Sequence, residues 1–597
     1  MRPASEERRK GFFGAINRHT RMAYEASYSA MLRKYGHLLR RLVSRRARYI
    51  VSFGALAIAV FAVLFFANNL PKGLVPSEDQ GVCMMNVSGV PGNNVASTYD
   101  VLTRAENIVK EIPEVSRFNK VAGYGFMSGQ GTSYGMMIMK LKPWDERRYG
   151  FWHPIDNFMS TSTMVANAKL NARLMAEIPD AQCFVFQPGM IPGYGMGGIE
   201  LQLQDKTGTA DKEVFFNYTQ DFLAKLSARP EVGRAVSTYA RNFPQYRVTV
   251  DAAQCKRAGI SPATVLSALG SYCGGAYVSN MNQFSKVYRV MLQSAPEYRM
   301  TEADLANMYV RNGSEMAPLS QFIKLEQIVG PEIDTRFNLF SSIAVNVVAA
   351  TGYSNTQVMQ AIKEVKEEVF PTGYDYEFGG IAREEAQTIG SIDTYLIYAV
   401  CVLLIFLILS CLYESFLIPF AVIFSVPAGL MGSFGFAWLW NQGYSVLPFI
   451  FLGQIENNIY LQTGVIMLIG LLGKTAILIT EYALERRRKG MGIVEAAYAA
   501  AEARLRPILM TVLTMIFGMI PLVFATGAGA NGNRTIGIAV IGGMIVGTLA
   551  ILFTVPVFFI FFEYLQEKIR PAMKVEADQQ FLKEQEHSLK EREEAEE

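Results

Sequence analysis

The chain has 597 residues, of which 50% are hydrophobic and 18% are charged, and its formal net charge is +3. This length exceeds one ordinary domain, and so apolar a composition predicts a polytopic membrane protein with a large soluble region. The small net charge argues against nucleic acid as a partner. Four histidines and six cysteines without a C-x-x-C spacing argue against a bound metal.

The first 48 residues are polar and basic, with scattered apolar side chains, as in EERRK and RRLVSRRAR. This pattern predicts a cytoplasmic amphipathic segment over 1–48 that lies on the membrane surface, and it lacks the features of a cleavable signal peptide. The next run, 49–69, is long and apolar enough for a transmembrane helix.

No run between 70 and 391 is long enough to cross a bilayer. Instead, helical and strand periodicities alternate, and each predicted helix ends just before a proline, which cannot continue it. The predicted helices are Tyr99–Glu111, Ala166–Ala176, Val214–Ala228 and Asn355–Val369. With the flanking strands they give the order β-α-β-β-α-β twice.

This order predicts two ferredoxin-like subdomains in an α/β region. The first occupies 70–195. The second is split into 196–240 and 341–390 by an inserted subdomain over 241–340. Within the insertion, a Cys255–Cys273 disulfide is one pairing that the sequence leaves open.

Five further apolar runs lie within 391–565, so the chain is predicted to have six transmembrane helices. These runs are Thr394–Leu412, Phe416–Trp440, Leu461–Ala483, Pro507–Ala525 and Thr535–Phe562. The apolar piece 446–453 is too short to cross and is expected at the membrane interface. The tail, 566–597, is highly charged and is predicted to be solvated.

Orientation follows from the basic residues that flank these runs. With six crossings, the basic clusters all lie on one side, which the positive-inside rule makes cytoplasmic. Both termini are then cytoplasmic. The α/β region lies on the opposite side, which is the periplasm if the membrane is the inner membrane of a Gram-negative bacterium.

Lys474 lies near the middle of the run Leu461–Ala483. A lysine at this depth costs about 2.5–3.5 kcal/mol on insertion scales and usually faces a partner or a watery cavity. It is too deep to reach the interface easily by extending its side chain. No Asp or Glu lies at comparable depth in the other runs, so we expect its counter-charge to come from outside this chain.

Polar residues of the next run could extend the same path. Thr511 and Thr514 lie one turn into Pro507–Ala525, although their hydroxyls could equally bond to their own helix. Arg504 and Arg506 have a simpler interpretation as cytoplasmic anchors.

The segment Gly123–Gly135, GYGFMSGQGTSYG, is a glycine-rich hairpin-like loop with exposed aromatic residues such as Tyr124 and Phe126. Flexible aromatic surfaces suit varied apolar ligands. Ile138, Phe184 and Phe186 on nearby strands could add to this surface, or could simply fill the core.

Two matches to nucleotide-binding patterns have the wrong context. The segment 470–475 resembles the end of a P-loop but lies inside an apolar span, and 527–532 joins two spans instead of opening a helix after a strand. No catalytic triad, HExxH or carboxylate pair is present in the sequence. These observations argue against an enzyme.

The sequence closely resembles the resistance–nodulation–division multidrug efflux pumps of the AcrB/MexB type. The matching stretches include GFFGAINR, LPKGLVPSEDQGV, RAGISPATVLSALGSYCGGAYV, LYESFLIPFAVIFSVPAGL, LLGKTAILITEYA, ARLRPILMT and PLVFATGAGA. They extend from about 11 to 562 and match the C-terminal half of such a pump.

The resemblance implies a role for each candidate residue. Lys474 matches the transmembrane lysine that pairs with two aspartates of the N-terminal half, and Thr511 and Arg504 match the proton-relay threonine and arginine. Residues 123–131 match the switch loop, with its glycines and aromatic positions. The implied switch-loop and substrate-binding residues are Gly123, Gly125, Gly129, Asn119, Tyr124, Phe126, Ile138, Phe184 and Phe186.

Asn119 departs from the family pattern, which often has phenylalanine at this position. This difference implies that the substrates of this chain are more polar.

The resemblance further implies proton/drug antiport without a cofactor, protons being the coupling ion. The implied partners are the N-terminal half, two further copies in a homotrimer, a periplasmic adaptor protein, an outer-membrane channel and amphiphilic drugs. The insertion 241–340 matches part of the funnel that docks the channel.

Two alternatives stay open. A heavy-metal exporter of the same superfamily would use a methionine cluster, for which Met84, Met85, Met136, Met137 and Met139 are candidates. A truncated half could instead act only as a binding or assembly subunit.

Overall fold

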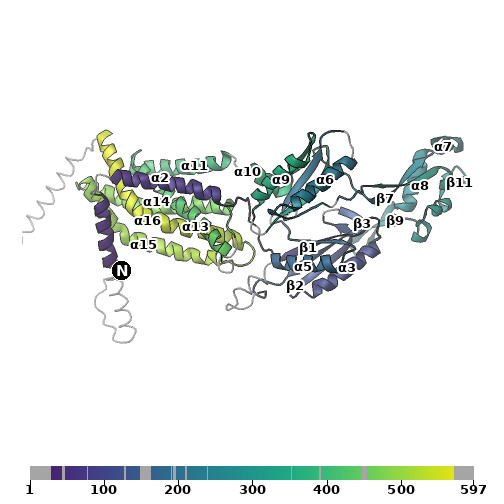
Figure 1. Cartoon of the computed structure of the whole chain (residues 1–597), viewed down its shortest axis with the longest axis horizontal. Helices are drawn as coiled ribbons and strands as arrows, with labels where there is room; N and C mark the ends of the chain where they lie inside the picture. The colour runs from purple at the N-terminus through teal and green to yellow at the C-terminus, as the bar shows by residue number, and fades with distance from the viewer. Residues whose placement is uncertain are drawn as a thin grey trace, which may run out of the picture.

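The computed structural model describes residues 28–569, except for 44–47, 77, 127–128, 148–162, 190, 192–196, 209–211, 238, 351–352, 389–391 and 447–453. The molecule is elongated, with a bundle of long helices at one end, two α/β units in the middle and the inserted segment at the far end (Figure 1). The apolar piece predicted at the membrane interface, 446–453, and the tail beyond 569 lie almost entirely outside the described residues.

Within the described residues, six helical segments are long and apolar enough to cross a membrane. Their helices are α2 (Arg48–Asn69), α11 (Ile392–Tyr413), α12 (Ile418–Ile423) continued by α13 (Val426–Val446), α14 (Ile459–Arg488), α15 (Ile493–Val523) and α16 (Ala530–Ile569). More than half of the residues in the central windows of the α12–α13, α14 and α16 spans are buried inside the bundle, whereas few residues in those of α2, α11 and α15 are buried. Each predicted run coincides with one of these helices.

The helix α15 begins well before the predicted run, which started at Pro507. The segment Ile493–Arg506 is rich in alanine, the best helix former, and it extends the helix by about four turns. Pro507 and Pro521 therefore lie inside α15. Neighbouring helices and local adjustments can make up for the hydrogen bond that an interior proline removes.

An amphipathic helix over 28–43 precedes α2 and packs against the bundle. The Tyr35 hydroxyl donates a hydrogen bond of 2.8 Å to the Leu552 carbonyl oxygen of α16, and Leu39 is fully buried. Arg40 lies over the ring of Tyr498 on α15. This helix is therefore held by the start of α15 and the middle of α16.

The first α/β unit has a four-stranded antiparallel sheet in the order β2-β3-β1-β4. Its elements, in chain order, are β1 (Val82–Ser88), α3 (Val95–Lys110), β2 (Val115–Gly125), β3 (Gly129–Leu141), α5 (Thr163–Glu177) and β4 (Gln182–Phe186). Both helices pack on one face of the sheet and form a core with alternate residues of every strand. The opposite face carries no helix of this unit among the described residues.

The second unit repeats this order with an interruption. Its elements are β5 (Ile199–Asp205), α6 (Lys212–Ser227), β6 (Val232–Ser237), β14 (Phe340–Ala349), α9 (Asn355–Val369) and β15 (Tyr374–Phe378), followed by α10 (Gly380–Thr388). The sheet order is β6-β14-β5-β15, and β13 (Thr335–Phe337) pairs with the start of β14. This sheet therefore already includes residues that precede 341.

The inserted segment is attached through a long antiparallel pair, β7 (Phe243–Val250) with β12 (Ile323–Gly330). It contains α7 (Ala252–Ala258), α8 (Pro262–Cys273), β8 (Ala276–Gln283), β9 (Lys286–Leu292), β10 (Tyr309–Asn312), β11 (Glu315–Pro318) and three short 3-10 helices, Pro296–Tyr298, Glu302–Asn307 and Leu319–Gln321. Cys255 is buried, Cys273 is exposed, and both are free thiols, so the open disulfide pairing is not formed.

Candidate functional site

Lys474 lies in the middle of α14, and its side chain is exposed on the surface of the bundle. Exposed Thr463, Met467 and Gly470 lie on the same stripe of the helix, at steps of three or four residues. An added Cβ at Gly470 would meet no atom within 4 Å. Among the residues that the structure describes, no carboxylate pairs with Lys474.

Thr511 lies at nearly the same depth as Lys474. The helices α14 and α15 pack together, and the contact of Tyr482 with Arg504 sets their register. Lys474 precedes Tyr482 by eight residues and Thr511 follows Arg504 by seven, so in antiparallel helices that rise 1.5 Å per residue they are about level. The Thr511 hydroxyl donates to the Ile508 carbonyl oxygen at 2.9 Å.

Arg504 is not brought to Lys474. Its guanidinium carbon lies 4.4 Å from the centroid of the Tyr482 ring, and Arg486 lies over the same ring at 5.0 Å. Arg504 is two turns away from Thr511 along α15. The Thr514 hydroxyl also bonds to its own helix, at the Met510 carbonyl oxygen.

The helix-free face of the first sheet brings together four of the predicted substrate residues. Residues directly opposite each other in antiparallel strands point to the same face. Asn119 is opposite Ile138, Ile138 is opposite Met84, and Met84 is opposite Phe186, so these four form one row across the sheet. In the next row Met136 is opposite Asn86, and Asn86 is opposite Phe184.

We call these two rows, with their side chains Asn119, Ile138, Met84, Phe186, Met136, Asn86 and Phe184, the aromatic face. The rings of Phe184 and Phe186 are stacked with centroids 5.5 Å apart. Phe126 meets Phe186 edge to face at 5.9 Å. The aromatic face therefore continues directly into the glycine-rich segment.

The glycine-rich segment is the tip of the β2–β3 hairpin, where Tyr124 is opposite Gln130 and Gly125 is opposite Gly129. Gly123 has φ +88° at a shift in strand register, and Gly129 has φ +72°, conformations that favour glycine. The Asn86 side-chain oxygen accepts a bond of 2.9 Å from the Phe126 N–H. A Cβ at Gly125 would crowd the same oxygen at 3.2 Å.

This arrangement leaves two aromatic side chains of the hairpin accessible. Tyr124 is 42% exposed and Phe126 is 41% exposed. Large aromatic side chains are usually buried, so their exposure beside the aromatic face favours contact with a ligand.

The methionines considered for metal binding lie on two opposite faces. Met85, Met137 and Met139 are fully buried in the core between the sheet and its helices. Met84 and Met136 are on the aromatic face. Because a sheet separates the two groups, the five cannot converge on one ion, which weakens the heavy-metal alternative.

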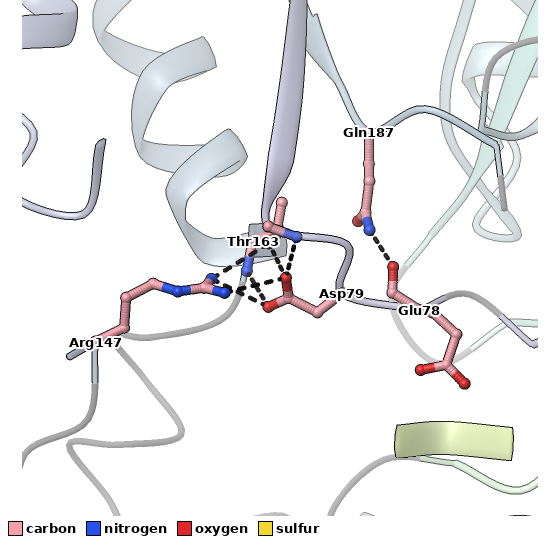
Figure 2. A network of polar contacts seen from close by, with 6 residues as sticks. Glu78, Asp79, Arg147, Thr163 and Gln187 are labelled. Atoms are coloured by element: carbon pink, nitrogen blue, oxygen red, sulfur yellow. Dashed lines mark hydrogen bonds and ion pairs between the residues drawn. The ribbon is translucent and has the colours of Figure 1, made fainter. Parts of the chain in front are cut away.

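Two consecutive carboxylates join the first α/β unit to the helical bundle (Figure 2). Glu78 accepts the backbone N–H groups of Asn531 and Gly532, at 3.0 and 2.6 Å, in the first turn of α16. Asp79 accepts the backbone N–H of Thr163 at 3.1 Å, in the first turn of α5, and also its hydroxyl. A displacement of α16 would therefore act directly on the start of α5.

Asp79 also pairs with Arg147, whose side chain is 1% exposed, at 3.2 Å. Burial alone would raise the pKa of Asp79, but the Thr163 hydrogen bond and the Arg147 charge outweigh it and lower that pKa below its usual value. Asp79 is thus an anion that neutralises a buried guanidinium.

A second junction contains two buried carboxyl groups. Glu456, just before α14, and Glu385 of α10 both approach Gly73. An added Cβ there would lie 2.5 Å from Glu456 Oε2 and 3.5 Å from Glu385 Oε1. Burial, with repulsion from Glu385, raises the pKa of Glu456 to about 7. Burial also raises the pKa of Glu385, although a bond from Asn355 opposes this.

This raised pKa predicts a pH dependence of stability. The folded state holds the Glu456 proton more tightly than the unfolded state, whose pKa is near 4.3. The free energy of unfolding should therefore fall as pH rises from about 4.3 to 7, by an amount on the order of 3–4 kcal/mol, and stay low above pH 7.

Thermal unfolding of the purified protein at pH 5, 6, 7 and 8 measures this effect. We expect the melting temperature of the Glu456→Gln variant to fall less over this range than that of the unmodified protein, and to be higher at pH 8. Equal pH profiles for the two proteins would show that Glu456 does not titrate there.

Sequence reasoning missed several of these residues. Glu78 and Asp79 were noted only as part of the stretch LPKGLVPSEDQGV that resembles the family, and no role was predicted for Glu456. Met84 was considered only as a possible metal ligand. Consecutive acids soon after a predicted span were the available signal for the junction, whereas no local pattern marked Glu456.

The chain matches the model of the AcrB/AcrD/AcrF family over residues 1–563. It is 33% identical over 555 residues to the multidrug/solvent efflux pump membrane transporter MepB of Pseudomonas putida, covering 92% of this chain and 49% of that protein. The same identity and shares hold for the toluene efflux pump membrane transporter TtgB, also of Pseudomonas putida.

A third relative, the multidrug resistance protein MdtF of Escherichia coli, is 31% identical over 544 residues, or 90% of this chain and 50% of that protein. The chain thus spans about half the length of the curated relatives it matches. A family match over nearly the whole chain shows that this chain belongs to the AcrB/AcrD/AcrF family of transporters.

Proposed function

We propose that this chain is the C-terminal half of a proton-driven pump that exports hydrophobic and amphiphilic drugs from the periplasm and membrane toward an outer-membrane channel. The observation that carries the proposal is Lys474, a cation in the middle of α14 that has no carboxylate partner among the described residues. The names of the relatives, which include multidrug, solvent and toluene efflux pumps, support it.

The first step concerns the counter-charge. Lys474 is exposed in this chain, yet a lysine in a bilayer normally faces a partner. Gly470, one turn away, leaves space in which a second helix can approach closely. We therefore assign the exposed stripe of α14 to contact with a helix of the N-terminal half that carries two aspartates.

The second step is the response to protons. Protonation of those aspartates would remove their attraction for Lys474 and shift α14, with Thr511 at the same depth on α15. The helix α14 packs on α16, whose first turn is bonded to Glu78. Asp79 then carries the movement to α5 of the first unit. Arg504 would act farther along α15, beside Tyr482.

On the substrate side, we assign drug binding to the aromatic face, with Tyr124 and Phe126 of the hairpin tip as the switch loop. Stacked rings give a large apolar contact with little geometric demand. Asn119, at the edge of the first row, adds a polar group and favours substrates with a polar end.

Assembly into a homotrimer is supported by the β8–β9 hairpin. Every residue of β9, and every residue of β8 after Ala276, is exposed, and Phe284 at the tip is 82% exposed. An isolated two-stranded hairpin is marginally stable in water, so a neighbouring subunit would stabilise it. The rest of the insertion would dock the outer-membrane channel and the adaptor protein.

In this proposal the six apolar helices cross the inner membrane, both termini are cytoplasmic, and the α/β region is periplasmic. The basic residues at the end of α14, Arg486, Arg487 and Arg488, are then on the cytoplasmic side, as the positive-inside rule requires.

Ethidium efflux from an efflux-deficient Gram-negative strain tests this function. The chain is expressed with and without an N-terminal half of the same family. We expect efflux only with both halves, and its loss on addition of a protonophore. Efflux that resists the protonophore would contradict the proposal, and protection against copper or silver alone would favour a metal exporter. If no N-terminal half restores dye efflux, the result would favour a binding or assembly subunit that does not itself transport.

A further inference from the structure

One basic side chain of the second unit lies against the aromatic face. The guanidinium carbon of Arg234, on β6, is 4.2 Å from the centroid of the Phe184 ring. This distance places the cation over the ring face, where the aromatic quadrupole attracts it. Phe184 stacks on Phe186, and Phe186 contacts Phe126. A continuous series of side-chain contacts therefore runs from the second unit to the hairpin tip.

The charge of Arg234 has no anion to balance it among the described residues. The side chain is about half-buried, and burial alone lowers its pKa, although a guanidinium stays protonated. Within the described part of the chain, Arg234 has neither an ion pair nor a side-chain hydrogen bond. Arg147, the buried arginine of the first unit, by contrast has Asp79. A cation that is partly withdrawn from water without a partner costs free energy that a bound anion would recover.

The contact with the ring leaves the donors of Arg234 available to a ligand. A guanidinium carries five N–H groups in a fixed fork, and within the described residues the Arg234 side chain contacts the Phe184 ring without a hydrogen-bond acceptor. That fork matches the two oxygens of a carboxylate. The Phe184 ring, which stacks on the buried Phe186 ring, and the exposed Phe126 ring would hold an apolar body attached to that carboxylate.

We propose that Arg234 is a specificity-determining residue that binds the carboxylate of anionic amphiphiles whose apolar part lies on Phe184 beside the hairpin tip. The inference rests on the proposed function, because it adds a charge preference to the same substrate surface. With Arg234, the chain would bind acids more tightly than their uncharged derivatives. The apolar rings alone would bind the uncharged derivatives more tightly.

The test uses the purified pump assembled from both halves and a matched pair of probes, 1-pyrenebutyrate and its methyl ester, with binding followed by fluorescence polarisation. We expect Arg234→Gln to weaken binding of the acid about tenfold or more and to leave the ester within about twofold. Arg234→Lys keeps the charge but loses the planar, bidentate arrangement of donors. Its affinity for the acid should lie between those of the unmodified pump and Arg234→Gln. Phe184→Ala should weaken both probes.

Arg229→Gln is the matched control, since Arg229 lies in the same unit and already pairs with Glu364. It should leave the binding of both probes unchanged. An equal loss of acid and ester in Arg234→Gln would show that the residue only holds the two units together, and unchanged binding of the acid would show that it does not contact the carboxylate. Either result would overturn the inference while the proposed function stands. If the unmodified pump binds neither probe nor ethidium, the function itself fails, and the inference with it.

Discussion

Replacing Lys474 with alanine is expected to abolish proton-coupled efflux without reducing the amount of pump in the membrane. The lysine would be one partner of an ion pair that is formed in a low-dielectric bundle. Removing one partner leaves the other charges uncompensated, at a cost of about 3–5 kcal/mol. Since about 1.4 kcal/mol changes a rate tenfold, transport should fall by about 100-fold or more.

Initial rates of ethidium efflux, normalised to the amount of pump on an immunoblot, measure this loss. Lys474→Arg keeps the charge with a different shape and should retain part of the activity. Lys489→Ala is the matched control, because Lys489 ends the same helix in an exposed pair with Glu485. It should change efflux less than about twofold. Normal efflux in Lys474→Ala would remove the basis of the proposed coupling.

Replacing Asp79 with alanine is expected to destabilise the first α/β unit by about 3–5 kcal/mol. The change leaves the Arg147 guanidinium buried without its carboxylate and removes both bonds to Thr163 at the start of α5. It also removes the side-chain link between α5 and the turn at Glu78, which is bonded to α16. Efflux should therefore fall together with stability.

Asp180→Ala provides the comparison, because Asp180 forms an ion pair with Arg104 in which both side chains are about half-exposed. Such surface pairs contribute about 0–1 kcal/mol. Thermal unfolding and limited proteolysis of the purified proteins should show early cleavage within 82–186 for Asp79→Ala only. The same melting temperature for both variants would mean that the Asp79–Arg147 pair contributes no more than a surface pair.

Much of the α/β region could be predicted from local patterns. The helix α9 begins and ends at the predicted residues, Asn355 and Val369, because a serine cap and Pro371 mark its two ends. Apolar periodicity likewise indicated strands where the structure has β1 to β6, β14 and β15, which pair in two separate sheets. The shared face of Asn119, Ile138 and Phe186 follows from that pairing, which no single strand could show.

The remaining features depend on contacts between distant segments. Glu78 meets α16 and Glu456 meets Glu385, and neither carboxylate belongs to a local motif. Arg234 looks in the sequence like an ordinary residue of an edge strand, and only the packing of the two units places it over Phe184. The start of α15 was missed because an alanine-rich helix that continues beyond the apolar run carries no hydropathy signal.

The central claim is that the balancing anions of Lys474 come from helices outside these 597 residues. A cryo-electron microscopy map of the assembled pump, in which the Lys474 ammonium and its neighbours are resolved, tests this most directly. The account predicts carboxylate oxygens of the N-terminal half within about 4 Å of the ammonium nitrogen. An ammonium that faces lipid or bulk water, or that pairs with a carboxylate of this same chain, would contradict it.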